Sequence, residues 1–327
     1  MNVISQEKKP LLTIITPCHN SAIFVHRLLD SVLEQSYPNV EMIMVDNAST
    51  DNTASVIESY VQRFEKKGYS LLYHRQGDMG PSGGLRTGMQ FMHGDYLTFP
   101  DSDDFYACSN ALETMVEKLE SLSNEYALVR TQVQQIDEQT MQSCGMFGDL
   151  LEEGETRGLF EDCLFARNGY YYVNIGFMIR VSALKEFVGL NFYTTSIVGP
   201  GRQIYMPLYF YRKCYSIKQV LSNYLVRRNS ISHGDYAKYQ VRKELYEQNE
   251  SYFNGFMSPI HGLSIQKKKW YKNAFMFQET ESIAGLAKFH NKRDYLKYKL
   301  LLIKYSNEPC HELVRFTKIF IKTLLGK

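Results

Sequence analysis

The chain has 327 residues, of which 44% are apolar and 22% are charged. This composition excludes a disordered chain, a collagen-like repeat and a disulfide-stapled miniprotein, and it suffices for one large core or two smaller ones. The formal net charge is only +2, so a general attraction to nucleic acid is not indicated. Residues 266–327 nevertheless contain 14 Lys or Arg against 5 Asp or Glu, an excess of +9 that leaves −7 for residues 1–265. The sequence therefore suggests an acidic body followed by a basic C-terminal region.

The six cysteines are widely spaced and form no Cys-x-x-Cys pair or Cys/His cluster, which argues against a structural zinc site. The first residues lack the apolar core of a signal peptide, and no apolar run approaches the roughly 18 to 20 residues of a membrane span. We therefore expect a cytoplasmic protein with free thiols, whose contact with a membrane, if any, is made from the surface.

Strands and helices alternate over the first hundred residues. Short apolar runs predict buried strands over residues 11–16, 40–45, 71–74 and 95–99. Between them, helical spacing predicts a helix over 22–35 opened by an Asn20–Ser21 cap, a helix over 53–64, and a helix that follows the glycine-rich stretch 80–84 and reaches residue 92. The first strand should end before Pro17, which cannot donate to a ladder. This alternation indicates an α/β fold with a parallel sheet.

Polar residues follow these strands at the edge where α/β sheets bind ligands. His19 and Asn20 follow the first strand, Asp46 ends the second, and Asp101 and Asp103 follow the fourth. Ligands bind beyond the carboxyl ends of parallel strands, so the convergence of three strand ends indicates a site there. Taken alone, Asp46 is equally typical of a turn.

The segment Asp-Ser-Asp-Asp at 101–104 carries three carboxylates in four residues with no Lys or Arg beside them. Residues two apart in an extended or turning chain project alike, so Asp101 and Asp103 are placed to face one hard cation. A cation held by only one or two carboxylates keeps positions for phosphate oxygens. The alternative is a solvated acidic loop before a helix predicted over 111–122.

Four motifs together resemble family 2 glycosyltransferases of the GT-A fold. They are TPCHN at 16–20, VDNASTD at 45–51, GPSGGLRTG at 80–88 and GDYLTFPDSDD at 94–104. The likeness is strong over residues 10–110, weaker to about 235 and absent beyond. It implies a GT-A domain over 1–235, with a nucleotide-sugar half at 10–110 and an acceptor half at 111–235. A basic, mostly helical region would follow over 236–327.

The resemblance assigns several residues to the nucleotide sugar. Pro17, His19 and Asn20 lie in the first loop, which in the family cups the base. Asp46 matches the aspartate that hydrogen-bonds the base, usually uracil, and Arg86 lies where the family places a basic residue near the nucleotide. The glycines of the 80–88 stretch would allow close approach of the backbone.

The segment 101–104 matches the family's DxD motif. The resemblance implies that Asp101 and Ser102 contact the donor, and that Asp101 and Asp103 hold Mg²⁺ or Mn²⁺ against the diphosphate. His233 would complete the metal shell or touch the diphosphate, unless it lies in a loop that contacts only solvent. The expected chemistry is one in-line displacement with inversion at the anomeric carbon, in which the metal stabilises the leaving nucleoside diphosphate.

The acceptor half departs from the family. Many relatives open a helix with a Glu-Asp pair whose Asp deprotonates the acceptor, whereas this chain has Arg202 and Gln203 there. Neither an amide nor a guanidinium is a general base. Three explanations stay open: another carboxylate serves, with Asp104 and Asp235 as candidates; the nucleophile is already acidic; or the protein only binds. The tyrosines in residues 169–180 either line the acceptor site or belong to the core.

The C-terminal region from about residue 235 is helical in pattern and rich in tyrosine. It contains the run KKKWYK at 267–272, with the only Trp of the chain at Trp270, and a later stripe formed by Leu313, Phe316, Phe320 and Leu324. Basic helices with aromatic residues lie in the headgroup region of anionic membranes. The alternative is a helical subdomain with solvated lysines. Nucleic acid is not expected as a partner, because no reading module accompanies the charge.

We therefore expect a metal-dependent inverting hexosyl- or N-acetylhexosaminyl-transferase, peripheral on the inner face of the cell membrane. Its donor would be a UDP-sugar, and its acceptor a glycan or lipid-linked precursor of bacterial surface polysaccharide. A non-catalytic subunit that binds sugar nucleotides would explain the missing Glu-Asp pair but would not need an intact DSDD. A nucleotidyltransferase would need a glycine-rich, lysine-bearing phosphate loop, which is not found near the N-terminus. The sequence does not specify the sugar, the acceptor or the oligomeric state.

Overall fold

The computed structural model describes residues 9–190, 193–194, 199–228, 239–306, 312–313, 316–317 and 319. The chain divides into two compact units, residues 1–226 and 227–327, which we describe separately. Five cysteines of the described residues are free thiols, and Cys310 lies outside them.

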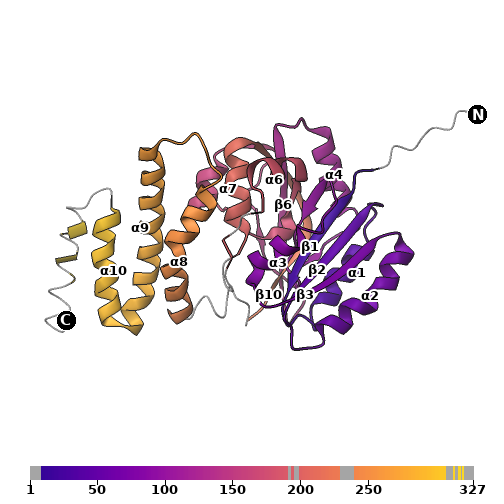
Figure 1. Ribbon diagram of the computed structural model, residues 1–327, viewed down its shortest axis with the longest axis horizontal. Helices are drawn as coiled ribbons and strands as arrows, with labels where there is room; N and C mark the ends of the chain where they lie inside the picture. The colour runs from indigo at the N-terminus through magenta and orange to yellow at the C-terminus, as the bar shows by residue number, and fades with distance from the viewer. Residues whose placement is uncertain are drawn as a thin grey trace, which may run out of the picture. The chain divides into compact units, whose positions relative to one another are not determined.

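The first unit is built on a ten-stranded mixed sheet (Figure 1). Eight strands follow the spatial order β3-β2-β1-β4-β9-β6-β10-β5, while β7 pairs with β6 and β8 with β10. The strands are β1 (Leu12–Cys18), β2 (Val40–Asn47), β3 (Ser70–Gln76), β4 (Tyr96–Thr98), β5 (Phe105–Tyr106), β6 (Tyr126–Asp137), β7 (Ser143–Phe147), β8 (Gly154–Thr156), β9 (Phe177–Arg180) and β10 (Lys213–Val226).

The sheet is parallel only in part. β3, β2, β1 and β4 are parallel neighbours, which confirms the prediction for the first four strands. β9 then runs antiparallel to both β4 and β6, and β10 is parallel to β6. The carboxyl ends of β1, β2 and β4 therefore meet at one edge of the sheet, which we call the carboxyl edge.

The prediction that Pro17 ends the first strand is wrong, because β1 continues through it to Cys18. The pairing of β1 with β4 stops at Ile14, whereas its pairing with β2 continues to Cys18 opposite Asp46. At Pro17 the strand therefore has a neighbour on one side only, and a proline without an N–H is tolerated there.

The helices of the first unit cover both faces of the sheet. Figure 1 shows α1 and α2 together on one side, and α3, which packs on β1 and β2, on the other. The helices are α1 (Val25–Leu33), α2 (Thr53–Lys67), α3 (Gly80–Gly88), α4 (Ala111–Ser121), α5 (Leu159–Phe165), α6 (Val181–Phe187) and α7 (Gly201–Tyr211).

The start of α1 differs from the prediction of a side-chain cap at Asn20–Ser21. The helix begins at Val25 without a side-chain cap, and the backbone N–H groups of Phe24 and Val25 donate to the carbonyl oxygen of Ser21, both at 2.9 Å. The hydroxyl of Ser21 instead contacts Ser102 at 2.7 Å, so it is used for a bridge between two loops.

The glycine-rich stretch forms α3 itself rather than preceding it, and the helix ends at Gly88 instead of residue 92. A Cβ on Gly84 would lie 2.8 Å from Cβ of Pro17, and a Cβ on Gly88 would lie 2.4 Å from Cγ2 of Ile15. These two glycines therefore bring the helix onto β1. The close backbone approach expected of these glycines therefore occurs between α3 and the sheet. The packing of α3 on β1 outweighs the low helix propensity of glycine.

The opposite edge of the sheet holds a buried carboxylate that the sequence analysis did not single out. Glu41 near the start of β2 is 9% exposed, and its Oε1 accepts from the hydroxyl of Thr13 at 2.5 Å and from the backbone N–H groups of His93 and Gly94 at 2.6 and 3.1 Å. Nδ1 of His93 lies 3.1 Å from Oε2. This network ties the loop before β4 to β1 and β2.

The tyrosine-rich segment 169–180 forms a strand only over its last four residues, after a 3-10 turn η1 (Asn174–Gly176). Tyr170 and Tyr171 are buried, and the ring of Tyr171 packs 5.3 Å from that of Phe177. Tyr205 of α7 lies 4.5 Å from the same Phe177 ring. Of the two interpretations of these tyrosines, the contacts of Tyr170 and Tyr171 support the core.

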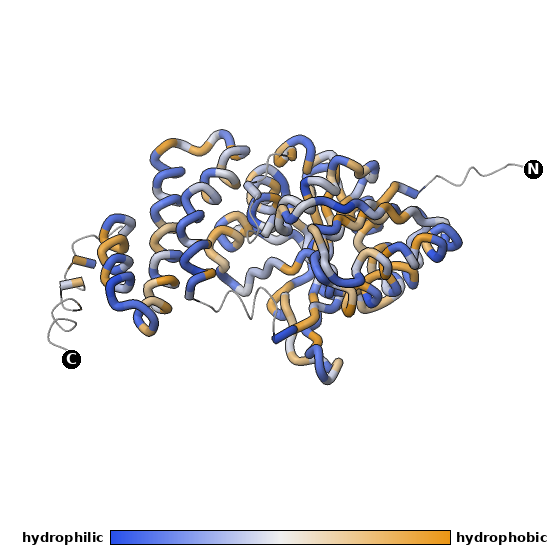
Figure 2. The backbone as a smooth tube through the Cα atoms, turned by 60° about the horizontal axis from the view of Figure 1, so that its bottom comes forward, coloured by the Kyte–Doolittle hydropathy of each residue, from blue (hydrophilic) through white to orange (hydrophobic). Residues whose placement is uncertain are grey.

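The second unit contains α8 (Tyr239–Met257), α9 (Ile265–His290) and α10 (Lys292–Tyr305). α9 packs against both other helices, and Figure 2 shows apolar and polar residues alternating along them. The shared core includes Ile283, Ala287 and Tyr298. Asp294 joins α10 to α8, because its Oδ2 accepts from the hydroxyl of Tyr239 at 2.7 Å and pairs with Nζ of Lys243 at 2.9 Å. No described helix has the length and apolarity to cross a membrane.

Candidate nucleotide-sugar site

Three loops that leave β1, β2 and β4 are bonded to one another at the carboxyl edge. The hydroxyl of Ser21 in the first loop contacts that of Ser102 in the third at 2.7 Å. The backbone N–H of Ser21 donates to Oγ1 of Thr53 at the start of α2, at 2.8 Å. The predicted strand ends therefore converge in a hydrogen-bonded network that joins the three loops.

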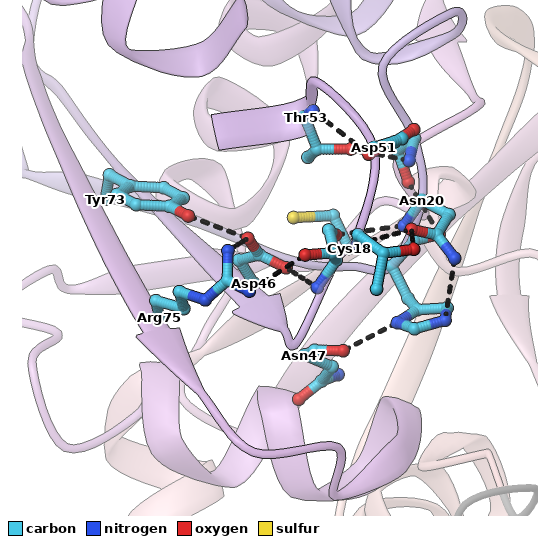
Figure 3. A network of polar contacts seen from close by, with 12 residues as sticks. Cys18, Asn20, Asp46, Asn47, Asp51, Thr53, Tyr73 and Arg75 are labelled. Carbon is cyan, nitrogen blue, oxygen red and sulfur yellow. Dashed lines mark hydrogen bonds and ion pairs between the residues drawn. The ribbon is translucent and has the colours of Figure 1, made fainter. Parts of the chain in front are cut away.

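Asn20 connects the first and second loops through both its backbone and its side chain (Figure 3). Its N–H donates to Oγ of Ser49 at 2.9 Å, and its Oδ1 accepts from the N–H of Thr50 at 2.8 Å. Its backbone has φ of +50°, which asparagine tolerates better than most residues. Its neighbour His19 is exposed and bonds through Nδ1 to the carbonyl oxygen of Asn47 at 2.6 Å. Both predicted residues thus lie on the site's rim.

Asp51 closes the second loop. Its Oδ2 accepts from the N–H of Ala22 at 3.1 Å, and its Oδ1 accepts from the hydroxyl and the N–H of Thr53. Burial alone would raise the pKa of this carboxyl, but the bonds from Thr53 and Ala22 outweigh it and lower the pKa. An ionised Asp51 therefore holds the first loop against the start of α2.

Asp46 at the end of β2 is fully buried, and three donors surround its carboxylate (Figure 3). Oδ1 accepts from the N–H of Ser49 at 2.8 Å, and Oδ2 accepts from the hydroxyl of Tyr73 at 2.7 Å. Nη1 of Arg75 lies 3.5 Å from Oδ2, and Nη2 donates to the carbonyl oxygen of Ser49 at 2.8 Å. The Asp46 carboxylate is therefore held in one orientation at the base of the second loop.

The acidic segment after β4 forms a turn, in which the N–H of Asp104 donates to the carbonyl oxygen of Asp101 at 3.2 Å. Asp101, Ser102 and Asp103 are half-buried at the rim. Asp104 is fully buried, and its Oδ1 accepts from the N–H of Leu225 in β10 at 3.2 Å. Asp104 thus ties the turn to the far half of the sheet.

The expected metal would depend on the carboxylates at the carboxyl edge. Among the described residues, no group of three His, Cys, Asp or Glu side chains forms a metal site. The turn does place two half-buried carboxylates, Asp101 and Asp103, at the carboxyl edge. Two hard oxygen donors fit a divalent cation that takes its other ligands from a diphosphate and water.

Two predicted residues, Arg86 and Gln203, lie within helices α3 and α7 and not in the three loops. Arg86 is half-buried six residues after the start of α3, about 9 Å along the helix axis at 1.5 Å per residue. Gln203 in α7 is 2% exposed, and its amide both accepts from the N–H of Tyr193 at 2.6 Å and donates to its carbonyl oxygen at 2.9 Å. The same amide nitrogen lies 3.4 Å from Oγ of Ser82 in α3. Gln203 is thus fully engaged in holding α7, α3 and residue 193 together.

His233 and Asp235 lie outside the described residues, as do Phe320 and Leu324 of the C-terminal stripe. The chain enters that region from the end of β10, whose Leu225 is bonded to Asp104.

Sequence reasoning missed four residues that shape the site. Ser21 and Ser49 bridge loops, and Tyr73 and Arg75 hold Asp46. The signal for Tyr73 and Arg75 was their spacing: residues two apart in a strand share a face. The signal for Ser21 and Ser49 was weaker, because small polar residues occur in any loop.

Comparisons with known proteins agree with this architecture. The model of "Glycosyl transferase family 2" matches residues 13–188, more than half of the chain. An uncharacterized glycosyltransferase of Haemophilus influenzae is 35% identical over 98 residues, covering 30% of this chain and 38% of that protein. GlyA of Streptococcus pneumoniae is 32% identical, covering 33% and 15%. The putative teichuronic acid biosynthesis glycosyltransferase TuaG of Bacillus subtilis is 33% identical, covering 34% and 44%. The chain thus spans less than half the length of each of these relatives.

Solved structures share the fold at low identity. Residues 1–349 of Staphylococcus aureus TarS, in complex with UDP-GlcNAc, superpose with a TM-score of 0.64 at 16% identity, covering 91% of this chain and 82% of that one. The mannosyltransferase PcManGT of Pyrobaculum calidifontis, in complex with GDP-Man and Mn²⁺, gives 0.53 at 13% identity, covering 98% and 89%. The α/β sheet with its polar carboxyl edge is the GT-A fold, and the chain belongs to glycosyl transferase family 2.

Proposed function

We propose that the protein transfers a glycosyl group from a nucleoside diphosphate sugar to an acceptor in the synthesis of a bacterial surface polysaccharide. The observation that carries the proposal is the bonded junction of three loops at the carboxyl edge, with Asp46 in one loop and Asp101 and Asp103 in another. Ligands of α/β sheets bind at this edge. TuaG, a relative by sequence, is named a putative teichuronic acid biosynthesis glycosyltransferase, which supports the class of product.

In this proposal, different loops contact different parts of the donor. Pro17, His19, Asn20 and Asp46 form the side of the site that receives the nucleoside, and Asp101 and Ser102 receive the ribose and diphosphate. In TarS the bound donor is UDP-GlcNAc and in PcManGT it is GDP-Man, so both UDP-sugars and GDP-sugars fit this fold. A hexose or an N-acetylhexosamine is the proposed sugar. Arg86 is the proposed basic residue near the nucleotide.

Asp101 and Asp103 would hold Mg²⁺ or Mn²⁺, with His233 as a further candidate ligand. The cation would supply charge neutralisation for the departing diphosphate. The chain's own contribution is to orient the donor, since the turn at 101–104 is fixed to β10 through Asp104 and to the first loop through Ser102. In a donor oriented in this way, a single attack by the acceptor oxygen opposite the departing diphosphate would invert the anomeric carbon.

The proton acceptor remains to be assigned between the two candidate carboxylates. A base must lie within about 3 Å of the proton that it removes. Asp104 is fully buried and bonded to the backbone of β10, so we assign it to positioning. Gln203 is likewise a positioning residue, since both ends of its amide are bonded to Tyr193. We therefore propose Asp235 as the base that deprotonates the acceptor hydroxyl.

The start of α9 is the proposed contact with the cytoplasmic face of an anionic membrane. Ile265 is 85% exposed and Trp270 is 43% exposed, and the side chains of Lys267 and Lys269 between them are exposed as well. Apolar and cationic groups on one helix end match the interior and the headgroups of an anionic leaflet. Such a contact would bring the site to a lipid-linked acceptor.

The test is a panel of UDP-sugars and GDP-sugars assayed for binding and slow hydrolysis, with Mn²⁺, with Mg²⁺ and with EDTA. We expect one donor to bind and to be hydrolysed only when metal is present. If no nucleotide sugar binds under any of these conditions, the proposal is wrong. Binding without hydrolysis or transfer would identify a non-catalytic subunit instead.

A further inference from the structure

The two oxygens of the Asp46 carboxylate have different partners. A carboxylate accepts about four hydrogen bonds, two on each oxygen. The hydroxyl of Tyr73 donates to Oδ2 at 2.7 Å, and Nη1 of Arg75 forms an ion pair with the same oxygen at 3.5 Å. The N–H of Ser49 occupies one position on Oδ1. Within the described residues, Oδ1 therefore keeps a second position open, while Oδ2 accepts from Tyr73 and is paired with the cationic Arg75.

The register of β3 produces this arrangement. Arg75 stands directly opposite Asp46 in the parallel pairing of β2 and β3, and Tyr73 lies two residues earlier on the same face. The side chain of Arg75 is 53% exposed while that of Asp46 is fully covered, so the guanidinium lies on the solvent side of the carboxylate. A planar group that reaches Asp46 must therefore contact Arg75 as well.

The hydroxyl of Tyr73 stays a donor at all physiological pH values. Burial and its bond to Asp46 raise the pKa of Tyr73 to about 12. The Tyr73 hydroxyl therefore keeps its proton, and its hydrogen bond to Oδ2 of Asp46, across this pH range.

We propose that Tyr73 and Arg75 are specificity-determining residues that make the nucleotide site select uracil over guanine. The inference rests on the proposed function, in which Asp46 meets the base. It deepens that function by choosing between the two donor classes seen in proteins of this fold.

The hydrogen-bonding edge of each base supplies the reason. Uracil presents one donor, N3–H, next to a carbonyl oxygen, which matches one open position on Asp46 next to the guanidinium of Arg75. Guanine presents two adjacent donors, N1–H and the 2-amino group, which match a carboxylate with both oxygens free. Tyr73 and Arg75 occupy the second oxygen here. Cytosine has no N3–H, so it would leave Asp46 facing an acceptor. A buried polar group left unpaired is costly enough to discriminate between the bases.

The experiment measures dissociation constants of UDP, GDP and CDP for the full chain with Mn²⁺, by calorimetry. The variants are Tyr73→Phe and Arg75→Gln. Matched controls are Tyr126→Phe, which removes a hydroxyl bonded to Glu155 at 3.0 Å, and Arg63→Gln, which removes an arginine paired with Asp30 at 2.8 Å. Thermal melting reports whether each variant is folded.

We expect the parent chain to prefer UDP, and each site variant to reduce the ratio of UDP to GDP affinity about tenfold, the equivalent of one hydrogen bond. The controls should keep the parent ratio. A loss of structure alone would weaken both nucleotides equally, so the ratio separates specificity from stability. A ratio unchanged in both site variants, or a parent chain that prefers GDP, would overturn the inference while leaving a nucleotide-binding site intact. If no nucleoside diphosphate binds the parent chain, the proposed function fails and the inference with it.

Discussion

The two units of the chain use their charged residues in opposite ways. In the first unit, Asp46 and Asp104 of the carboxyl edge are buried and Asp101 and Asp103 are half-buried, while Asp46 and the exposed Asp51 each accept several hydrogen bonds. In the second unit, the excess charge is basic, and Lys267 and Lys269 are exposed at the start of α9. Buried, bonded charges act over one contact distance and fix geometry, whereas exposed cations act over a Debye length of about 8 Å and are screened by salt. Substitutions at the carboxyl edge should therefore change chemistry, and those at the start of α9 should change location.

The largest expected effect separates the units most clearly. Asp103→Asn removes one of two carboxylates proposed to hold the cation, so transfer should fall about 10³-fold and metal-dependent binding of the donor nucleotide should be lost. The melting temperature should stay within a few degrees of the parent value, and vesicle binding should not change. Activity assays, calorimetry with and without metal, and sedimentation measure these quantities. Full activity in this variant would remove the role given to the acidic turn.

The second prediction compares the two carboxylates considered for proton removal, Asp104 in the first unit and Asp235 in the second. Asp235→Asn should lower turnover about 10²-fold while the donor affinity changes less than twofold, as expected when only a general base is lost. Asp104→Asn should instead lower the melting temperature, because Asp104 is buried and bonded to β10. Single-turnover rates, donor titrations and thermal melts of both variants decide the assignment. The reverse pattern would make Asp104 the base.

The third prediction concerns the second unit alone. Lys267/Lys268/Lys269→Ser should weaken binding to anionic vesicles at low salt by up to about 10²-fold, since each lysine near such a surface contributes about 1 kcal/mol. High salt should reduce the difference, and donor affinity should not change. The matched control Lys66/Lys67/Lys185→Ser removes the same charge from exposed positions in the first unit. Equal sedimentation with neutral and anionic lipid, at any salt concentration, would leave the second unit as a packed helical subdomain only.

The smallest expected effect concerns a carboxylate of the second unit, Asp294, which is hydrogen-bonded as the carboxylates of the first unit are. Bonds from Tyr239 and Lys243 lower the pKa of Asp294. Its contribution to stability is therefore present above the unfolded pKa of about 3.9 and is lost as the pH falls through the lower folded value. Asp294→Asn should cost about 1 kcal/mol of unfolding free energy at pH 7 and less below pH 4. Urea titrations of this variant and of Glu281→Gln, an exposed control, at pH 7 and pH 3.5 measure it. A loss that is equal at both pH values would contradict the ionic contribution.

Local pattern was enough to predict the first four strands, because each is an apolar run bounded by turn-forming residues. It was not enough for the far half of the sheet. There β9 lies between β4 and β6, and β10 pairs with β6 and β5, so the order depends on contacts between distant segments. The helix α3 was misplaced for a related reason. Its glycines have low helix propensity, and only their packing against Pro17 and Ile15 stabilises the helix there.

The residues of the site also differ in whether local sequence is enough to predict them. Asp46, Asp101 and Asp103 were predictable because they follow strands, and position along the chain alone brings them to the carboxyl edge. Tyr73 and Arg75 were not, because their relation to Asp46 depends on the register between β2 and β3. Glu41 was missed although a charged residue in an apolar strand is a recognisable signal.

The close fit of α3 on β1 has a practical consequence for anyone who wishes to retarget the donor by directed evolution. Any side chain at Gly88 would meet Ile15, and any at Gly84 would meet Pro17, so a library built on this helix would consist mostly of misfolded members. β3 is an edge strand with no further strand beyond it among the described residues of the sheet, and the side chain of Arg75 is half-exposed. Larger or different side chains can therefore be accommodated in β3. Randomised codons are better placed in β3 than at the two glycines where α3 packs on β1.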